Sequence, residues 1–228
     1  MSDTTRIAAT AALLGDPARA NILAALMDGR ALTAKELAFA AHVSPQTTSG
    51  HLGKLAEAGL LTPQKQGRHR YYRIASPLVG QMLEGIMALS AATDERPAER
   101  RTTWRGGDAL RTARSCYDHL AGRLGVGLAD SLCEQGFVAL TADGGEVTDN
   151  GHRFLRGFGA EPEPGKRVFC RPCLDWSERR PHIAGRLGAA LASRCFELGW
   201  IQRQRDTRAV AITEAGRAGF ADKFGVVL

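Results

Sequence analysis

Hydrophobic and polar positions between residues 33 and 74 follow a helical period and then a strand period. Thr33 can cap one short helix, and Ser44 followed by Pro45 can begin a second helix. The apolar positions that we expect to face a core here are Val43, Leu52, Leu55 and Leu60. Two strands with alternating side chains follow, joined by a turn at Gln66–Gly67. This order of elements predicts a helix-turn-helix with a β-wing.

The polar face of the second helix and the wing carry candidate DNA contacts. Short polar side chains near a helix N-terminus suit base edges, and basic side chains without acidic neighbours suit phosphates. The candidates on the helix are Gln46, Thr47, Thr48, Ser49, His51 and Lys54, and those on the wing are Lys65, Arg68, Arg70 and Tyr72. A basic hairpin alone is also typical of a solvated surface, but after a capped helix pair it favours a double-stranded DNA operator as the partner.

The segments LGDPARANILAAL (residues 14–26) and HLGKLAEAGLLTPQKQGRHRYYRI (residues 51–74), with the helix pair between them, resemble the ArsR/SmtB family of dimeric bacterial repressors. The resemblance covers about residues 5–91. It implies a winged-helix homodimer, built on the helices Arg6–Leu14 and Leu78–Ala91, that an inducer releases from DNA. Many metal-sensing members carry cysteines in the helix-turn-helix, whereas this chain has none before Cys116. Any small-molecule or metal inducer is therefore expected to act elsewhere.

Length and composition predict two domains and a location in the cytoplasm. The 228 residues carry a net charge of +6, which favours a polyanionic partner. We expect neither a membrane span nor a secretory leader, and we expect the five cysteines to be free thiols or ligands. The predicted DNA-binding and dimerisation domain covers residues 1–92. A polar linker, residues 93–107, then leads to a sensing domain in residues 108–228.

The second half contains an internal repeat. HLAGRLGVGLADSLCEQGFV, which begins at His119, matches HIAGRLGAALASRCFELGWI, which begins at His182, at ten of twenty positions. We interpret residues about 108–158 and about 173–222 as two helix–hairpin–helix units that resemble degenerate winged helices. The whole chain is thus predicted to be α+β and mainly helical. The spacing of Cys116, His119 and Gly122 predicts one helix face, and two such helices meeting at their glycines would bring His119 and His182 together.

Thiols and imidazoles of this half form a candidate effector or metal site. Cys170 and Cys173 form a C-x-x-C motif, which is typical of tetrahedral zinc or metalloid sites. The full candidate set is Cys116, His119, Cys170, Cys173, His182 and Trp176, with the tryptophan walling an apolar cavity. The candidate cofactor is a thiophilic metal ion such as zinc, and a site with no cofactor is the alternative. Two packed helices with buried histidines would also explain these residues.

Three functions are open for this half. It can be an effector domain that binds a small molecule or soft metal ion, or a redox or electrophile sensor in which Arg171 lowers the pKa of a neighbouring cysteine. A thiol enzyme fused to a DNA-binding domain is the third alternative. The C-x-x-C motif follows no βαβ pattern and no catalytic constellation stands out, so we predict a regulator without catalytic residues.

Overall fold

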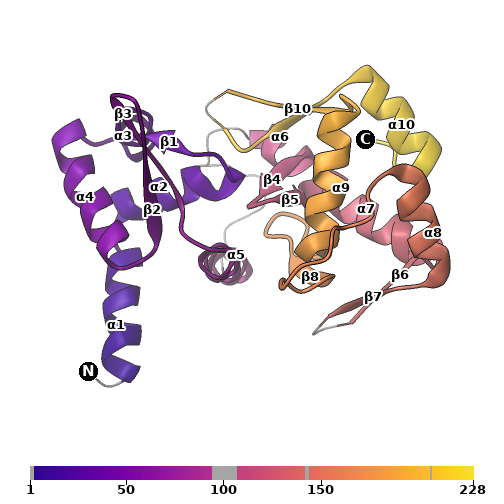
Figure 1. Cartoon of the computed structure of the whole chain (residues 1–228), viewed down its shortest axis with the longest axis horizontal. Helices are drawn as coiled ribbons and strands as arrows, with labels where there is room; N and C mark the ends of the chain where they lie inside the picture. Colours follow the sequence, from indigo (N-terminus) through magenta and orange to yellow (C-terminus); the bar gives the residue numbers. More distant parts are fainter. Residues whose placement is uncertain (1–2, 94–106, 142–143, 206) are drawn as a thin grey trace. The chain divides into compact units, whose positions relative to one another are not determined.

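The computed structural model describes residues 3–93, 107–141, 144–205 and 207–228, and it is α+β and mainly helical (Figure 1). The chain divides into two compact units, residues 1–83 and 84–228, and the division falls inside helix α5, Pro77–Ala92. The expected linker, residues 93–107, lies almost wholly outside the described residues. No helix within the described ranges is long and apolar enough to cross a membrane.

The first unit is a winged helix-turn-helix. Its elements are α1 (Asp3–Leu14), α2 (Pro17–Ala25), the 3-10 helix η1 (Leu26–Asp28), β1 (Leu32–Thr33), α3 (Ala34–Ala41), α4 (Pro45–Glu57), β2 (Leu61–Gln66), β3 (His69–Ile74) and the start of α5. The three strands form an antiparallel sheet in the order β1-β3-β2. Its core consists of apolar side chains that are almost completely buried: Ile22, Leu23, Leu26, Met27, Leu37, Leu52 and Leu55.

Local capping fixes the two helices of the helix-turn-helix. The Thr33 hydroxyl accepts a hydrogen bond from the backbone amide of Glu36, and the Glu36 carboxylate accepts one from the backbone amide of Thr33. Together these two bonds form a capping box. The Ser44 hydroxyl accepts the amide of Thr47, and Pro45 occupies the first turn. These contacts confirm the predicted helix-turn-helix, and β2 and β3 confirm the predicted wing.

The second unit places the same order of elements in residues 114–158 and in residues 171–224: a short hairpin, a helix, a second hairpin and a helix. After α6 (Gly107–Thr112), the elements are β4 (Arg114–Cys116), β5 (His119–Ala121), α7 (Gly122–Glu134), β6 (Val138–Leu140), β7 (Gly145–Val147) and α8 (Asp149–Phe158). They are followed by β8 (Arg171–Leu174), β9 (Pro181–Ala184), α9 (Gly185–Glu197), β10 (Ile201–Arg203), β11 (Val210–Ile212) and α10 (Glu214–Phe224).

The hairpin before each long helix corrects the sequence-based prediction. Cys116 and His119 are not on a helix face with Gly122, because they are opposed partners on the antiparallel strands β4 and β5. Gly122 begins α7 instead of lying within it, and its φ of 77° is one that a side chain would strain. A two-residue turn and a helical turn both bring residues three apart close together, so this spacing alone does not separate them.

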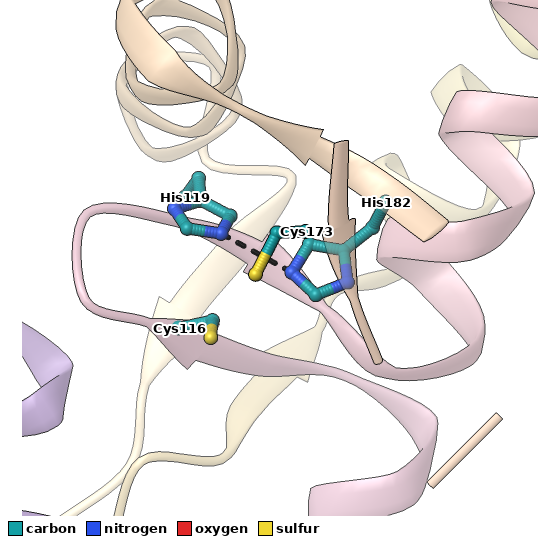
Figure 2. A group of neighbouring side chains, drawn as sticks. All are labelled: Cys116, His119, Cys173 and His182. Atoms are coloured by element: carbon teal, nitrogen blue, oxygen red, sulfur yellow. Dashed lines mark hydrogen bonds between the residues drawn. The ribbon is translucent and has the colours of Figure 1, made fainter. Parts of the chain in front are cut away.

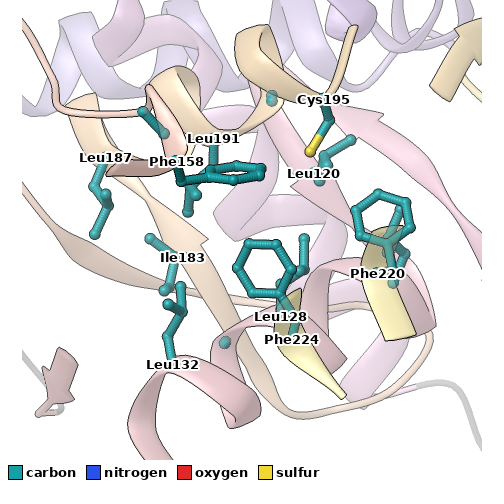
Figure 3. Close-up of a cluster of buried hydrophobic side chains, with 14 of the residues drawn as sticks. Leu120, Leu128, Leu132, Phe158, Ile183, Leu187, Leu191, Cys195, Phe220 and Phe224 are labelled. Carbon is teal, nitrogen blue, oxygen red and sulfur yellow. The ribbon is translucent and has the colours of Figure 1, made fainter. Parts of the chain in front are cut away.

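Both halves of the second unit share one hydrophobic core (Figure 3). Leu128, Leu132 and Phe158 of the first half lie in the same cluster as the second half's Ile183, Leu187, Leu191, Phe220 and Phe224. Each long helix packs against a strand of the other half: α7 lies against β9, and α9 lies against β5. Each long helix therefore supports the hairpin of the other half, which is where the cysteines and histidines are found.

Candidate DNA interface and buried cysteine-histidine cluster

Helix α4 presents a polar face to solvent. Gln46, Thr47, Ser49 and Lys54 are exposed, and His51 is half-buried. His51 is also connected to the rest of the unit, since its Nδ1 lies 3.4 Å from the guanidinium of Arg19. The same guanidinium donates to the carbonyl of Leu13 at 2.7 Å, so Arg19 ties the end of α1 to α4. The hydrophobic and polar pattern of the sequence did not predict this role of Arg19.

The prediction of DNA contacts is wrong for Thr48 and Tyr72, because both side chains are buried. Thr48 is fully buried and its hydroxyl donates to the carbonyl of Ser44 at 2.9 Å. It lies on the core face because it precedes Leu52 by four residues, one turn of helix. Tyr72 is only 8% exposed, whereas the neighbouring Tyr71 is half-buried. The alternation of the strand thus holds, but the packed ring is Tyr72.

The wing is an exposed basic hairpin. Lys65 and Arg70 are opposed across β2 and β3, and Arg68 and Arg73 are also exposed. Gly67, with φ of 57°, forms the turn between the strands. No acidic residue lies between Leu61 and Ile74, so the positive charge of the wing is not neutralised locally.

In the second unit, four side chains converge in the interior: Cys116, His119, Cys173 and His182 (Figure 2). All four are buried, and their donor atoms lie within 4.8 Å of one another. Cys116 is opposed to His119 across β4 and β5, and Cys173 is opposed to His182 across β8 and β9. Each hairpin thus supplies one thiol and one imidazole, and we call these four residues the cysteine-histidine cluster.

The two imidazole rings of the cluster are oriented alike. Nε2 of His119 lies 3.1 Å from Nε2 of His182 (Figure 2). On the outer side, Nδ1 of His119 lies 3.3 Å from a carboxylate oxygen of Asp118, and Nδ1 of His182 lies 3.4 Å from one of Asp175. Each ring therefore turns one nitrogen to the cluster and the other toward a carboxylate. The motifs Cys116-Tyr-Asp118 and Cys173-Leu-Asp175 were the sequence signal for these aspartates.

A buried ion pair holds Asp175 in place. Its carboxylate accepts a hydrogen bond from the guanidinium of Arg114 at 2.8 Å and another from the amide of Gly122 at 2.6 Å. The side chains of Arg114 and Asp175 are both fully buried. Although burial opposes ionisation, Arg114 lowers the pKa of Asp175 to about 2. The guanidinium also lies 4.4 Å from the ring centre of Trp176. Trp176 thus stacks on Arg114, while Trp200 packs on Phe220 in the hydrophobic core.

Glu84 of helix α5 also reaches the cluster. The thiol of Cys116 donates to one carboxylate oxygen of Glu84 at 3.4 Å, and the thiol of Cys173 donates to the other at 3.3 Å. Arg171 donates to the same carboxylate at 3.2 Å. Burial raises the pKa of Glu84 to about 7. Glu84 was not among the predicted site residues, although a single acidic residue in the largely apolar segment 77–92 is a signal for such a role.

The remaining thiols lie apart from the cluster. Cys170 precedes β8 and belongs to the hydrophobic core, so the C-x-x-C motif does not bring both of its sulfurs to one point. Cys170 lies in the bend before β8, outside the hairpin that carries Cys173, and this explains the separation of the two sulfurs. Burial raises the pKa of Cys170 to about 11. Cys133 and Cys195 pack in or against the same core.

Within the cluster the ionisable groups influence one another strongly. The neighbouring thiol of Cys173 lowers the pKa of Cys116, and the neighbouring Cys116 raises the pKa of Cys173. Burial opposes the charging of His119, but hydrogen bonds to Asp118 and Cys116 raise its pKa to about 10. Burial lowers the pKa of His182. Two thiols and two imidazoles packed this closely could hold a cation.

The chain belongs to the HTH-type transcriptional regulators, which are DNA-binding proteins. A family model described as a helix-turn-helix domain matches residues 14–64. The HTH-type transcriptional regulator YdfF of Bacillus subtilis is 43% identical over 223 residues, which are 96% of this chain and 97% of YdfF. The similarity thus includes both the winged helix and the second unit.

Two solved structures are similar to a smaller part of the chain. HlyU from Vibrio cholerae is 26% identical, with a TM-score of 0.36, and the match covers 39% of this chain and 97% of HlyU. Rv0081 of M. tuberculosis is also 26% identical, with a TM-score of 0.37, and the match covers 40% of this chain and 93% of Rv0081.

Proposed function

We propose that this regulator is a homodimeric repressor that leaves its operator when an effector binds the second unit. Helix α4 reads base edges through Gln46, Thr47 and Ser49, and the basic wing contacts phosphates. The exposed short side chains at the N-terminus of α4 support this role, since they can enter the major groove without rearrangement. Such a protein acts in the cytoplasm, where the DNA is, and needs no catalytic residue.

Exposed apolar side chains on α1 and α5 support the homodimer. Helix α1 has no buried residue, and its Ile7 is 70% exposed. On α5, Leu78 is 73% exposed and Leu89 is 65% exposed. Large apolar side chains on two helices are costly in water, and a second copy of the chain can cover them symmetrically. These are the first and last helices of the winged-helix module, as the family resemblance implies.

The observation that carries the effector proposal is the position of Glu84. Its carboxylate accepts hydrogen bonds from both thiols of the cysteine-histidine cluster, and α5 continues from Glu84 directly into the winged-helix unit. An effector that engages the thiols removes both donors from Glu84 and thereby changes the surroundings of α5. A coupling of about 1–3 kcal/mol is enough to weaken operator binding five- to 150-fold.

The test uses full-length protein and fluorescent DNA from upstream of its own gene. We expect a dimer by light scattering and specific binding by anisotropy that exceeds binding to a scrambled duplex. An Ile7→Glu, Leu89→Glu variant should be monomeric and should lose specific binding. Lys35→Glu, a charge change at an exposed position of α3, should remain dimeric. Equal affinity for cognate and scrambled DNA under reducing and oxidising conditions would contradict the proposal.

A thiol switch is the second candidate, favoured by the proximity of two sulfurs. The Sγ atoms of Cys116 and Cys173 are within 4.8 Å of each other. Hydrogen peroxide can oxidise both thiols to one disulfide while it is reduced to two molecules of water, and this also removes the donors to Glu84. Peroxide should then release the operator, dithiothreitol should restore binding, and Cys173→Ser should abolish the response.

The two halves of the second unit are proposed to be a duplicated, degenerate winged-helix unit. Their common order of elements and the ten identities in twenty aligned positions support the duplication. In both halves a long helix is followed by a hairpin, as α4 is followed by the wing. Expected domain limits remain 1–92 and 108–228.

A further inference from the structure

We infer that Cys116, His119, Cys173 and His182 bind one zinc ion in a tetrahedral site that is shared by the two halves of the second unit. The inference that the ion binds depends only on the geometry and chemistry of the cluster. Its use as the effector rests on the proposed function.

The spacing of the donor atoms is the first support. Zn²⁺ lies about 2.0–2.1 Å from imidazole nitrogen and about 2.3 Å from thiolate sulfur, so the edges of such a tetrahedron are about 3.3–3.8 Å. Nε2 of His119 and Nε2 of His182 are 3.1 Å apart, and all four donor atoms lie within 4.8 Å of one another. An ion among them requires the longest donor separations, of up to 4.8 Å, to shorten by about 1 Å and the two Nε2 atoms to move slightly apart.

The chemistry of the donors selects the class of ion. Two thiolates and two imidazoles in a tetrahedron suit Zn²⁺, whereas Mg²⁺ and Ca²⁺ require mainly oxygen ligands. Binding deprotonates both thiols, and the two negative charges balance the dication in the protein interior. Four ligands from the protein leave no open coordination position, which is typical of structural and regulatory zinc and not of catalytic zinc.

The outer surroundings of the histidines match those of metal ligands. Asp118 and Asp175 lie at the Nδ1 atoms, which leaves both Nε2 atoms free to coordinate. Among the described residues, Nδ1 of His182 has no hydrogen-bond partner of good geometry, although Asp175 is 3.4 Å away. A slight rotation of the ring toward the ion would complete that bond. Arg114 and the amide of Gly122 already hold Asp175 in position.

The backbone of each half is shaped to bring the hairpins together. A Cβ atom at Gly125 would lie 3.6 Å from Cβ of His182, and one at Gly188 would lie 3.0 Å from Cβ of His119. The glycines thus allow each long helix to approach the histidine of the other half. The four ligands converge because each long helix packs against the hairpin of the other half. Neither half could therefore supply the site by itself.

The experiment is metal loading of the full-length, reduced protein. Native mass spectrometry with elemental analysis should find one zinc per chain. After replacement by Co²⁺, the visible bands of tetrahedral cobalt and thiolate-to-cobalt charge transfer in the near ultraviolet should appear. Cys116→Ser and Cys173→Ser should each lose these signals, and Asp118→Asn should weaken binding about 10- to 100-fold. Cys170→Ala is the matched control, because it removes the other thiol of the C-x-x-C motif and should keep one ion per chain.

The outcomes separate the site from its role. Wild-type protein that binds neither zinc nor cobalt overturns the inference even if a serine variant is unfolded, as does loss of the ion in folded Cys170→Ala. One ion per chain with tetrahedral cobalt bands supports the site. If adding or removing that ion leaves operator affinity unchanged, the ion is structural and its effector role is overturned. If the metal-bound and metal-free proteins both fail to bind operator DNA, the proposed function fails while the metal site stands.

Discussion

Gly188 of one half of the second unit lies directly against His119 of the other half. A methyl group at Gly188 would stand 3.0 Å from Cβ of His119 and well inside contact distance of the carbonyl of Ile183. We therefore expect Gly188→Ala to destabilise the unit by about 1–3 kcal/mol through overpacking and to displace His119. Denaturant unfolding followed by a cobalt titration would measure both effects.

Gly157 is the matched control for this substitution. It lies in helix α8, and a Cβ atom there meets nothing within 4 Å. Gly157→Ala should leave the stability unchanged or raise it by about 0.5–1 kcal/mol, because alanine favours a helix. Equal effects of the two substitutions would show that the contact with His119 has no special importance.

Arg114 and Asp175 should be essential as a pair. Arg114→Met leaves the fully buried carboxylate of Asp175 without its guanidinium, so we expect a loss of about 3–5 kcal/mol in the free energy of unfolding. The double variant Arg114→Met, Asp175→Leu should recover part of that loss, because it removes both charges. Thermal and urea unfolding of the wild type, of the single variants Arg114→Met and Asp175→Leu, and of the double variant would check this. A double variant that loses as much stability as the two single variants together would argue against the pair.

Wing arginines should supply affinity without sequence selectivity. Arg70→Ala removes an exposed charge from β3 and should weaken binding to cognate and scrambled duplexes alike. The slope of log affinity against log salt concentration should fall by about one. Anisotropy titrations at several salt concentrations would measure it, and a loss confined to the cognate duplex would instead indicate a base contact.

Gln46 should contribute selectivity. Its side chain is exposed in the first turn of α4, and an amide can pair with an adenine edge. Gln46→Ala should reduce cognate binding by about 1–3 kcal/mol and leave non-specific binding nearly unchanged. The same assay on scrambled DNA serves as the control.

Glu84 should matter for the response and not for DNA binding itself. Glu84→Gln keeps the size of the side chain but removes its charge, so operator affinity without inducer should be close to that of the wild type. The change in affinity on metal loading should become several-fold smaller, because the contact between the cluster and α5 is altered. An unchanged response would remove Glu84 from the signalling route.

The winged helix was predictable because its determinants are local. The caps Thr33 and Ser44, the first-turn Pro45 and the alternation of the wing each depend on a few neighbouring residues. Burial of Thr48 could also have been found, since its spacing from Leu52 is one helical turn. It was missed because a short polar side chain was read as a DNA contact.

The second unit was only partly predictable because its determinants are not local. The sequence repeat predicts correctly that His119 and His182 lie close together, but it places them on helices. The turn before His119 was not predicted, because tyrosine is not typical of tight turns, although Tyr117 has a φ of 60°. Glu84 joins the cluster across more than thirty positions of chain, and no periodicity encodes that contact. The C-x-x-C motif predicts that Cys170 and Cys173 act together, although Cys170 precedes the strand that carries Cys173 and packs in the hydrophobic core.

The sharing of the cysteine-histidine cluster between two hairpins has a consequence for folding. Cys116 and Cys173 are 57 positions apart, so an ion held by both hairpins cross-links the chain and closes a long loop. Such a link restricts the unfolded chain more than a site within one hairpin would. During synthesis, the last ligand, His182, emerges well after the first hairpin is complete. Metal uptake would then mark chains whose second half has been made and correctly joined to the first.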